Sequence, residues 1–291
     1  MKFGNIEQPE SFDFILPPDH PDTLRVLGLK NKQKINVCVG CAKWNRTDLK
    51  GFYPRGTKDE LAYYSTQFNS IELNATFYSI PDVHQVVTWR DKTPGDFKFF
   101  PKITDRISHY KRLNGVELLV DEYCSNISHF ESKLGMVFLQ LHNNFAYKDF
   151  DRLAKFITTF PAGIPLAVEL RNSSWFNDPM ISEKIYTLLE NNNITNIIVD
   201  TAGRRDLLHM RLTTPTAFIR YVGANHPSDY TRLDDWVERL EPWITGGLEN
   251  LCFFVHQNIE KESPLLSAYF IQKLNEKYGL NVRGPVRGDL F

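Results

Sequence analysis

Charged and amide side chains occur in pairs near the ends of two apolar segments of this sequence. Glu72 lies two residues before Asn74, and Glu169 lies two residues before Arg171. Successive side chains in a β-strand alternate between its two faces, so each pair would point to the same side of its strand. Carboxylates serve acid–base catalysis, and amide and guanidinium groups orient polar or anionic ligands. These four residues form the centre of a candidate site.

Other apolar segments end on similar side chains. The candidates at these ends are Lys102, Gln140, His142, Asp200, Arg220, His256 and Gln257. Charged groups inside a protein are costly to desolvate unless they are paired or meet a ligand, so their recurrence at segment ends indicates a site. Among all the candidates, however, three acids (Glu72, Glu169 and Asp200) balance three bases (Lys102, Arg171 and Arg220), so a neutral network of ion pairs without a ligand is the alternative interpretation.

Loop residues extend the candidate site. His109, close to Arg112, is a candidate proton shuttle because an imidazole titrates near neutral pH; a surface histidine is the alternative. Three aromatic residues, Trp44, Tyr78 and Trp175, are predicted to line the mouth of the site and to stack on a ligand. The loop that contains Trp44 is long enough to form a lid.

Motifs for nucleophilic serine, nucleotide or zinc-protease chemistry are missing from the sequence. Carboxylates and imidazoles that together could ring a divalent ion are Glu72, His142, Glu169, Asp200 and His256. Arg171 and Arg220 beside these acids argue against a cation and favour an anionic or carbonyl-bearing ligand held by two hydrogen bonds. We therefore predict no metal ligands and leave the cofactor unspecified.

The elements that must position these residues alternate along the chain. Eight short apolar or β-branched segments are expected strands, at 35–42, 70–77, 97–103, 135–141, 165–170, 195–200, 217–222 and 251–257. Helical patterns separate most of them, at 57–68, 82–90, 120–132, 150–160, 180–191, 232–243 and 264–278. Thr57 and Glu60 have the spacing of a capping box, which predicts the start of the first of these helices. Among the connections between strands, 201–215 has the weakest helical pattern.

This alternation predicts an α/β fold built from one parallel sheet. Several strands are apolar on both faces, as expected where helices cover one face and a core fills the other. Eight strands without an early glycine-rich phosphate loop favour closure into a single (β/α)8 barrel over an open sheet. We expect the barrel to occupy residues 35–291, with 1–34 as an extension packed across it. Active sites of such barrels lie at the carboxyl ends of the strands, where the candidate residues fall.

Net charge and the lack of long apolar stretches limit the kinds of partner that the sequence favours. A formal net charge of −1 does not favour nucleic acid as a partner. The sequence has no apolar stretch long enough to cross a membrane and no secretory pattern at its start, so we expect a cytoplasmic protein without a membrane partner. Cys38 and Cys41 lie three apart in an expected strand and would point to opposite faces, which predicts packing cysteines rather than a metal or disulfide pair.

An ordered set of short motifs resembles a known family. The motifs are G-x-x-x-W at 40–44, GFYP at 51–54, ELNATFY at 72–78, LQL at 139–141, ELR at 169–171 and SW at 174–175, together with Lys102, His109 and Arg112. They resemble the YecE-like family, also called domain of unknown function 72, over about residues 35–260. The resemblance implies a TIM-type barrel and no established activity. This chain has Asn172 and Val222 where the family commonly has histidine, whereas His109 and His256 remain.

These observations lead to a functional hypothesis with two alternatives. We expect an enzyme that acts on a small polar or anionic molecule, with Glu72 or Glu169 as general acid or base and His109 as proton shuttle; Asp200 is a further catalytic candidate. Predicted ligand-binding residues are Asn74, Tyr78, Lys102, Gln140, Arg171, Trp175, Arg220, His256 and Trp44. The alternatives are a barrel that binds an anion without catalysis and a metal-dependent enzyme of phosphoester or nucleic-acid chemistry.

Overall fold

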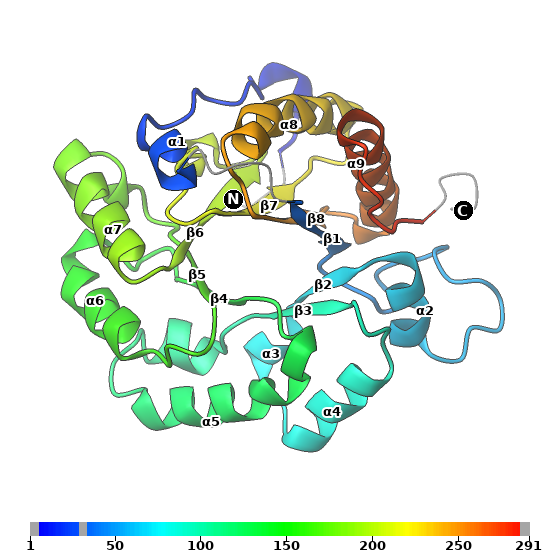
Figure 1. Cartoon of the computed structure of the whole chain (residues 1–291), viewed down its shortest axis with the longest axis horizontal. Coiled ribbons are helices and arrows are strands. Elements are labelled where there is room, and N and C mark those ends of the chain that lie inside the picture. The colour runs from blue at the N-terminus through cyan, green and yellow to red at the C-terminus, as the bar shows by residue number, and fades with distance from the viewer. Residues whose placement is uncertain (1–5, 29–33, 286–291) are drawn as a thin grey trace.

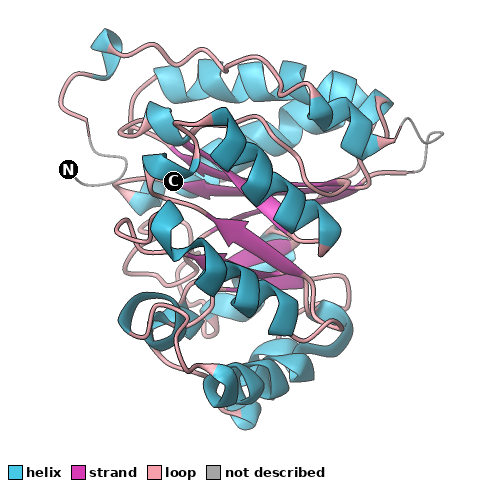
Figure 2. Ribbon diagram, turned by 90° about the vertical axis from the view of Figure 1, so that its left-hand side faces the viewer, coloured by secondary structure: helices cyan, strands magenta, loops and turns pink. Residues whose placement is uncertain are grey.

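A parallel α/β architecture positions the candidate residues. The computed structural model describes residues 6–28 and 34–285, and within them each of the eight expected segments contains a strand (Figure 1). The strands are β1 (Asn36–Cys41), β2 (Ser70–Leu73), β3 (Lys98–Pro101), β4 (Val137–Gln140), β5 (Leu166–Glu169), β6 (Thr195–Thr201), β7 (Thr216–Val222) and β8 (Asn250–His256). Helices surround the strands in Figure 1 and cover them on both sides in Figure 2.

Helices form in all seven segments with a helical pattern. They are α2 (Glu60–Gln67), α4 (Val83–Asp91), α5 (Glu117–Ile127), α6 (Phe150–Thr159), α7 (Pro179–Asn191), α8 (Ser228–Thr245) and α9 (Ser263–Tyr278). Two short helices were not expected, α1 (Asp22–Leu27) and α3 (Ala75–Tyr78). Among the described helices, none combines the length and apolarity that a membrane crossing needs.

The predicted cap of α2 is wrong. Asp59 is the capping residue, and its carboxylate accepts a hydrogen bond from the Ala62 amide at 3.0 Å. The Thr57 hydroxyl instead donates to the Pro54 carbonyl at 2.9 Å, in the preceding turn. Aspartate and threonine are both common at the first capping position of a helix. The prediction chose Thr57 because of its spacing to Glu60, although Asp59 was an equally suitable cap.

The described strands form two parallel sheets. Six strands follow the order β1-β8-β7-β6-β5-β4 and curve into a half-barrel, and β2 pairs with β3. Between β3 and β4, the Ile103 amide donates to the Phe138 carbonyl at 2.9 Å and the Gly135 amide donates to the Phe99 carbonyl at 2.8 Å. The short strand β3 therefore lies beside the β4 edge of the larger sheet.

A tyrosine hydroxyl joins β1 to β2. The Tyr64 hydroxyl, from α2, accepts a hydrogen bond from the Cys41 amide at 2.8 Å and donates to the Ser70 carbonyl at 3.1 Å. Gly40 makes this close approach possible, because a Cβ atom at that position would lie 2.2 Å from the Ser70 carbonyl oxygen. Only glycine fits so close to a neighbouring backbone.

Apolar side chains fill two separate regions of the core. The larger cluster lies between strands and helices, and the smaller one consists of Phe100, Phe138, Ala167, Ile197, Val199, Phe218, Cys252 and Phe254, on the opposite faces of β3 to β8. Its four phenylalanines contact one another, for example Phe100 and Phe254 with ring centroids 4.8 Å apart. We call these four residues the aromatic layer.

The described N-terminal residues contact α8 and the connection 201–215. Asp19 accepts hydrogen bonds from Arg239 and Trp243 of α8, and the Thr23 hydroxyl donates to the Met210 carbonyl at 2.9 Å. Residues 1–5 and 29–33 of the expected extension lie outside the described residues. The connection 201–215, where a helical pattern was weakest, contains only the 3-10 turn Arg205–Leu207.

Replacing Gly40 with alanine tests the contact between β1 and β2. The added methyl group would collide with the Ser70 carbonyl, so we expect a loss of stability of at least the roughly 1–3 kcal/mol typical of overpacking. Urea unfolding followed by circular dichroism measures the loss. Gly95→Ala is the control, because a Cβ atom there meets nothing within 4 Å; equal stability of the two variants would contradict this reading of the close approach.

Candidate functional site

Arg220 is the centre of a buried charge network at the carboxyl ends of the strands. From β7, its guanidinium donates two hydrogen bonds of 2.8 Å to the two carboxylate oxygens of Glu72 on β2. A third N–H donates to Glu169 on β5 at 2.5 Å. All three side chains are buried. Charge-assisted bonds of this paired geometry are strong, and one guanidinium thereby connects three strands.

A chain of hydrogen bonds continues from Glu169 to Lys102. The Gln140 side-chain amide donates to both Glu169 oxygens, at 3.1 and 3.0 Å, and its own oxygen accepts from Lys102 Nζ at 2.8 Å. Arg171 also donates to Glu169 through Nε. The ammonium or amine of Lys102 lies 4.0 Å from the centre of the Phe77 ring. Six predicted residues are thus brought together with Phe77, which was not among the candidates: Arg220, Glu72, Glu169, Arg171, Gln140 and Lys102.

Glu72 has two further partners. His256 Nε2 lies 3.0 Å from one carboxylate oxygen of Glu72, and Asn74 Nδ2 donates to the other oxygen at 2.8 Å. The sequence predicted that Asn74 lies close to Glu72, but it attributed this to the alternation of side chains along a strand, and that reason is wrong. β2 ends at Leu73, and Asn74 has a helical backbone at the start of α3. The side chain turns back to Glu72 because the chain turns there.

The guanidinium groups keep both carboxylates ionised. Burial alone would raise the pKa of Glu169, but the charges of Arg171 and Arg220 outweigh burial and lower this pKa to about 2. For Glu72, burial is likewise outweighed by Arg220 and His256, so its pKa lies well below the ordinary value. A carboxylate that remains ionised and bound to arginine at neutral pH is a poor proton donor.

Lys102 differs from the two carboxylates. Its side chain is only 7% exposed, and burial together with repulsion from Arg220 and Arg171 lowers its pKa to about 7, although Glu169 and Glu72 act in the opposite direction. His109 packs edge-on against Phe77, with centroids 5.0 Å apart. Burial and the nearby Lys102 lower the pKa of His109 to about 4, so its imidazole is neutral at pH 7. Lys102 therefore titrates near neutrality, whereas the two carboxylates do not.

Asp200 lies away from this network. The Arg232 guanidinium and the Trp236 indole of α8 donate to its carboxylate at 2.8 and 2.7 Å, and Arg205 donates as well. Its neighbour Val199 belongs to the smaller core cluster, so Asp200 points to the helix side of β6. The structure does not bring it to the other candidates, because strand alternation places it on the other face.

The three predicted aromatic residues also lie apart from Lys102. Trp175 is fully buried and donates from its indole to the Phe145 carbonyl at 2.9 Å, as a core residue does. Trp44 is half-buried and packs edge-on against Trp89. Tyr78 is 76% exposed and contacts Phe77. Phe77, whose ring contacts the Lys102 amine, was missed; its position in the segment 72–78, three residues after Asn74, was the available signal.

Metal-binding groups do not converge. Within residues 6–28 and 34–285, no three histidine, cysteine, aspartate or glutamate side chains lie where they could share an ion. Of the five residues considered for such a ring, only Glu72, Glu169 and His256 belong to the network. His142 packs edge-on against His109, with ring centroids 5.3 Å apart. The guanidinium of Arg220 occupies the position between the two carboxylates.

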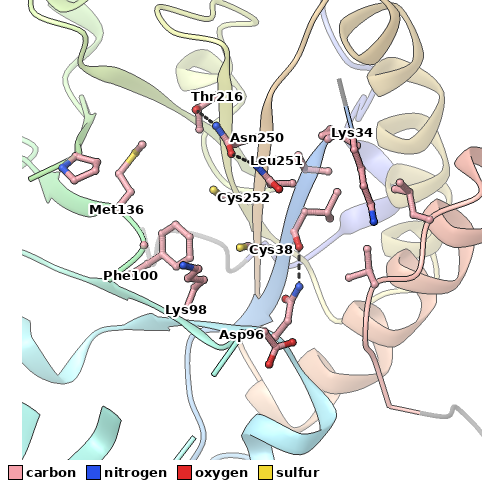
Figure 3. A pocket seen from close by; sticks show the side chains of 18 of the residues that line it. Lys34, Cys38, Asp96, Lys98, Phe100, Met136, Thr216, Asn250, Leu251 and Cys252 are labelled. Carbon is pink, nitrogen blue, oxygen red and sulfur yellow. Dashed lines mark hydrogen bonds between the residues drawn. The ribbon is translucent and has the colours of Figure 1, made fainter. Parts of the chain in front are cut away.

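A cavity of about 780 Å³ lies at the opposite ends of the strands (Figure 3). Cys38, Cys252 and Phe100 face it, and Lys98 lies at its edge.

Cys38 and Cys252 are register partners on β1 and β8, whereas Cys41 packs in the larger core cluster. Cys38 and Cys41 thus point to opposite faces, as predicted. Lys98 and Phe100 of β3, and Lys102 directly after its end, follow each other at two-residue spacing from this cavity to the charge network.

Comparison with known families identifies the chain. The family model described as "Protein of unknown function DUF72" matches residues 38–287. The chain belongs to the DUF72 family. The resemblance seen in the motifs from 40–44 to 174–175 is therefore confirmed. Every motif residue from Gly40 onward, including Glu72, Lys102, Glu169 and Arg171, falls within the matched range.

Relatives of this DUF72 protein have no described activity in their names. The UPF0759 protein YecE of Escherichia coli K12 is 27% identical over 229 residues, which cover 71% of this chain and 82% of that relative. A DUF72 protein of Thermotoga maritima MSB8 of known crystal structure is 25% identical, with a TM-score of 0.68 over 82% of this chain and 99% of its own. The crystal structure of a DUF72 protein from Enterococcus faecalis V583 is 18% identical in sequence and shows the shared fold. Its TM-score is 0.68 over 85% of this chain and 99% of its own.

Stability at low pH tests the state of Glu169. Its pKa in the folded protein, about 2, lies below its ordinary value of 4.5, so the ion pairs stabilise the fold fully above pH 4.5 and this stabilisation is lost as the pH falls toward 2. The shift corresponds to about 3 kcal/mol. We expect Glu169→Gln to be destabilised at pH 7 and to lose less stability between pH 5 and pH 2 than the parent.

Denaturant unfolding at each pH provides the measurement. Glu117→Gln is the control, because Glu117 forms an exposed pair with Lys155 and its replacement should leave the pH profile nearly unchanged. Parallel profiles for the parent and Glu169→Gln would show that Glu169 is not held ionised by its partners.

Proposed function

We propose that this protein is an enzyme that acts on a small anionic molecule at the charge network, with Lys102 as the group that exchanges the proton. One observation carries the proposal: a buried lysine with a pKa of about 7 lies among two guanidiniums and two carboxylates at the ends of the strands. Groups with a strongly shifted pKa are most frequent at functional sites. A proton donor and acceptor works best when its pKa is close to the working pH.

The other residues have supporting roles in this proposal. Glu72 and Glu169 hold Arg220 and Arg171 in place and remain ionised, in contrast to the general acid or base role expected from the sequence. Arg171, whose side chain is 17% exposed, provides positive charge at the open side of the network. Gln140 and Asn74 orient the carboxylates, and the neutral imidazole of His109 accepts a proton near Phe77. Hydrolase, isomerase and lyase chemistry are all compatible with these roles.

We also infer that the two sheets form one closed eight-stranded barrel. The hydrogen bonds between β3 and β4, and the Tyr64 hydroxyl between β1 and β2, support closure. So does the connection of β2 to β5 and β7 through Arg220. In such a barrel the network would lie at the end where active sites of this architecture occur.

A barrel that binds an anion without catalysis is the second candidate. The state of Glu72 and Glu169 favours it, because arginine holds both carboxylates ionised and they are therefore poor proton donors. The balanced total charge of the chain gives no support to nucleic acid as the ligand. The two candidates differ in a measurable way: an enzyme converts its ligand, whereas a binding protein returns it unchanged.

Replacement of Lys102 tests the proposed enzyme. We expect a panel of small carboxylated and phosphorylated molecules, followed by NMR, to contain a substrate whose turnover falls by about 10²–10⁴-fold in Lys102→Met, the usual contribution of a general acid or base. The pH profile of the parent should bend near pH 7. Lys98→Met, four residues before Lys102 and beside the cavity of Figure 3, should retain activity.

Two results would count against the enzyme. A molecule that binds tightly and is recovered unchanged would favour the binding protein. Turnover that is equally fast in the parent and in Lys102→Met would remove Lys102 from the chemistry, provided that both proteins show the same circular dichroism spectrum.

A further inference from the structure

We propose that Lys102 is a nucleophile that forms a Schiff base with the carbonyl carbon of a 2-oxo acid or a similar small anionic carbonyl compound. This inference rests on the proposed function and adds a covalent step and a substrate class to it. It is carried by the surroundings of Lys102 Nζ: a neutral hydrogen-bond acceptor, an aromatic face, and two guanidiniums already engaged by the two carboxylates.

Charges around Lys102 favour an amine over an ammonium. Glu72 and Glu169 are each bound by arginine, so the two negative charges of the network are matched by Arg220 and Arg171. Within the described part of the chain, no carboxylate lies within ion-pair distance of Nζ, whose hydrogen-bond partner is the neutral Gln140 oxygen at 2.8 Å. Burial without a carboxylate partner, next to other cations, is the environment in which a lysine becomes an uncharged nucleophile.

A ligand from solvent would reach Lys102 past two half-exposed histidines. Lys102 directly follows the last residue of β3, and the whole residue is 7% exposed. His109 packs against the Phe77 ring that contacts Lys102 Nζ, and His142 packs against His109; both histidines are half-exposed. A carbonyl compound that enters between these rings and Arg171 would meet the amine with its anionic group near the guanidinium.

The covalent step balances without a further reagent. The lone pair of Nζ forms the C–N bond, and the π electrons of the carbonyl move to its oxygen, which takes up a proton. The nitrogen then loses a proton, which gives a neutral carbinolamine. The carbinolamine hydroxyl takes up a second proton, the C–O bond breaks, and one water molecule leaves as the protonated C=N bond forms; the second proton is returned when the C=N nitrogen loses its own. His109, whose imidazole is neutral at pH 7, packs against the Phe77 ring that also contacts Nζ and is placed to carry a proton during this exchange.

Reductive trapping tests the Schiff base. The folded full-length protein is incubated at pH 7 with glyoxylate, pyruvate or 2-oxoglutarate and cyanoborohydride, and labelled lysines are located by peptide mass spectrometry. With at least one of the three compounds we expect Lys102 to be labelled at least tenfold faster than Lys98, which lies four residues earlier at the start of β3. The labelling rate should level off above about pH 7, whereas that of surface lysines should continue to rise.

Matched variants distinguish this inference from the proposed function. Lys102→Arg retains a cation at the site but cannot form an imine, so labelling at this position should be lost while Lys98→Arg retains full labelling of Lys102. Binding of the same three compounds to the parent and to Lys102→Arg is measured by NMR line broadening, and circular dichroism confirms folding.

The outcomes separate cleanly. If none of the three compounds labels Lys102 faster than Lys98, the Schiff base is wrong. If these compounds still bind, and binding is lost in Arg171→Ala, the anion site of the proposed function survives without the covalent step. If the compounds neither label nor bind and the wider panel yields no turnover, the proposed function fails as well.

Discussion

The contacts of Arg220 with Glu72 and Glu169 organise the carboxyl ends of the strands. A buried guanidinium is tolerated only when its N–H groups are satisfied and its charge is balanced, and the two glutamates provide both. Removal of any one of the three would leave an uncompensated charge in the interior. The positions of β2, β5 and β7 at this end therefore depend on a single set of charge-assisted hydrogen bonds, and Gln140, Asn74 and His256 are oriented by joining it.

The type and order of the strands and helices were predictable from the distribution of apolar residues. A strand buried on both faces is a short run of apolar residues, and a helix buried on one face has apolar residues at helical spacing. The segments around Val39, Leu139 and Phe253 show such a run, and each became a strand. Element ends were harder to predict, since they depend on single hydrogen bonds. The end of β2 at Leu73 and the cap of α2 at Asp59 are set by such local contacts. Each involves only a few residues, so it leaves no periodic pattern in the sequence.

Candidate site residues were predictable where strand alternation decides the direction of a side chain. Glu169 and Arg220 point inward for this reason and meet in the network. Asp200 was misplaced because its segment is buried on both faces, so apolar patterning did not distinguish the core side from the helix side. The environment of Lys102 was beyond prediction, because its pKa depends on contacts among residues more than thirty positions apart, such as that with Gln140.

The aromatic layer has a consequence for stereochemistry. Phe100, Phe138, Phe218 and Phe254 close the space beneath the charge network, and Arg220 lies 5.5 Å from the Phe138 ring. A planar molecule bound at the network would have one face toward the network and the phenylalanines beneath it, and the other face toward solvent. Water or a second reactant could then add only from the solvent side, so new bonds to a flat carbon would form with a single handedness.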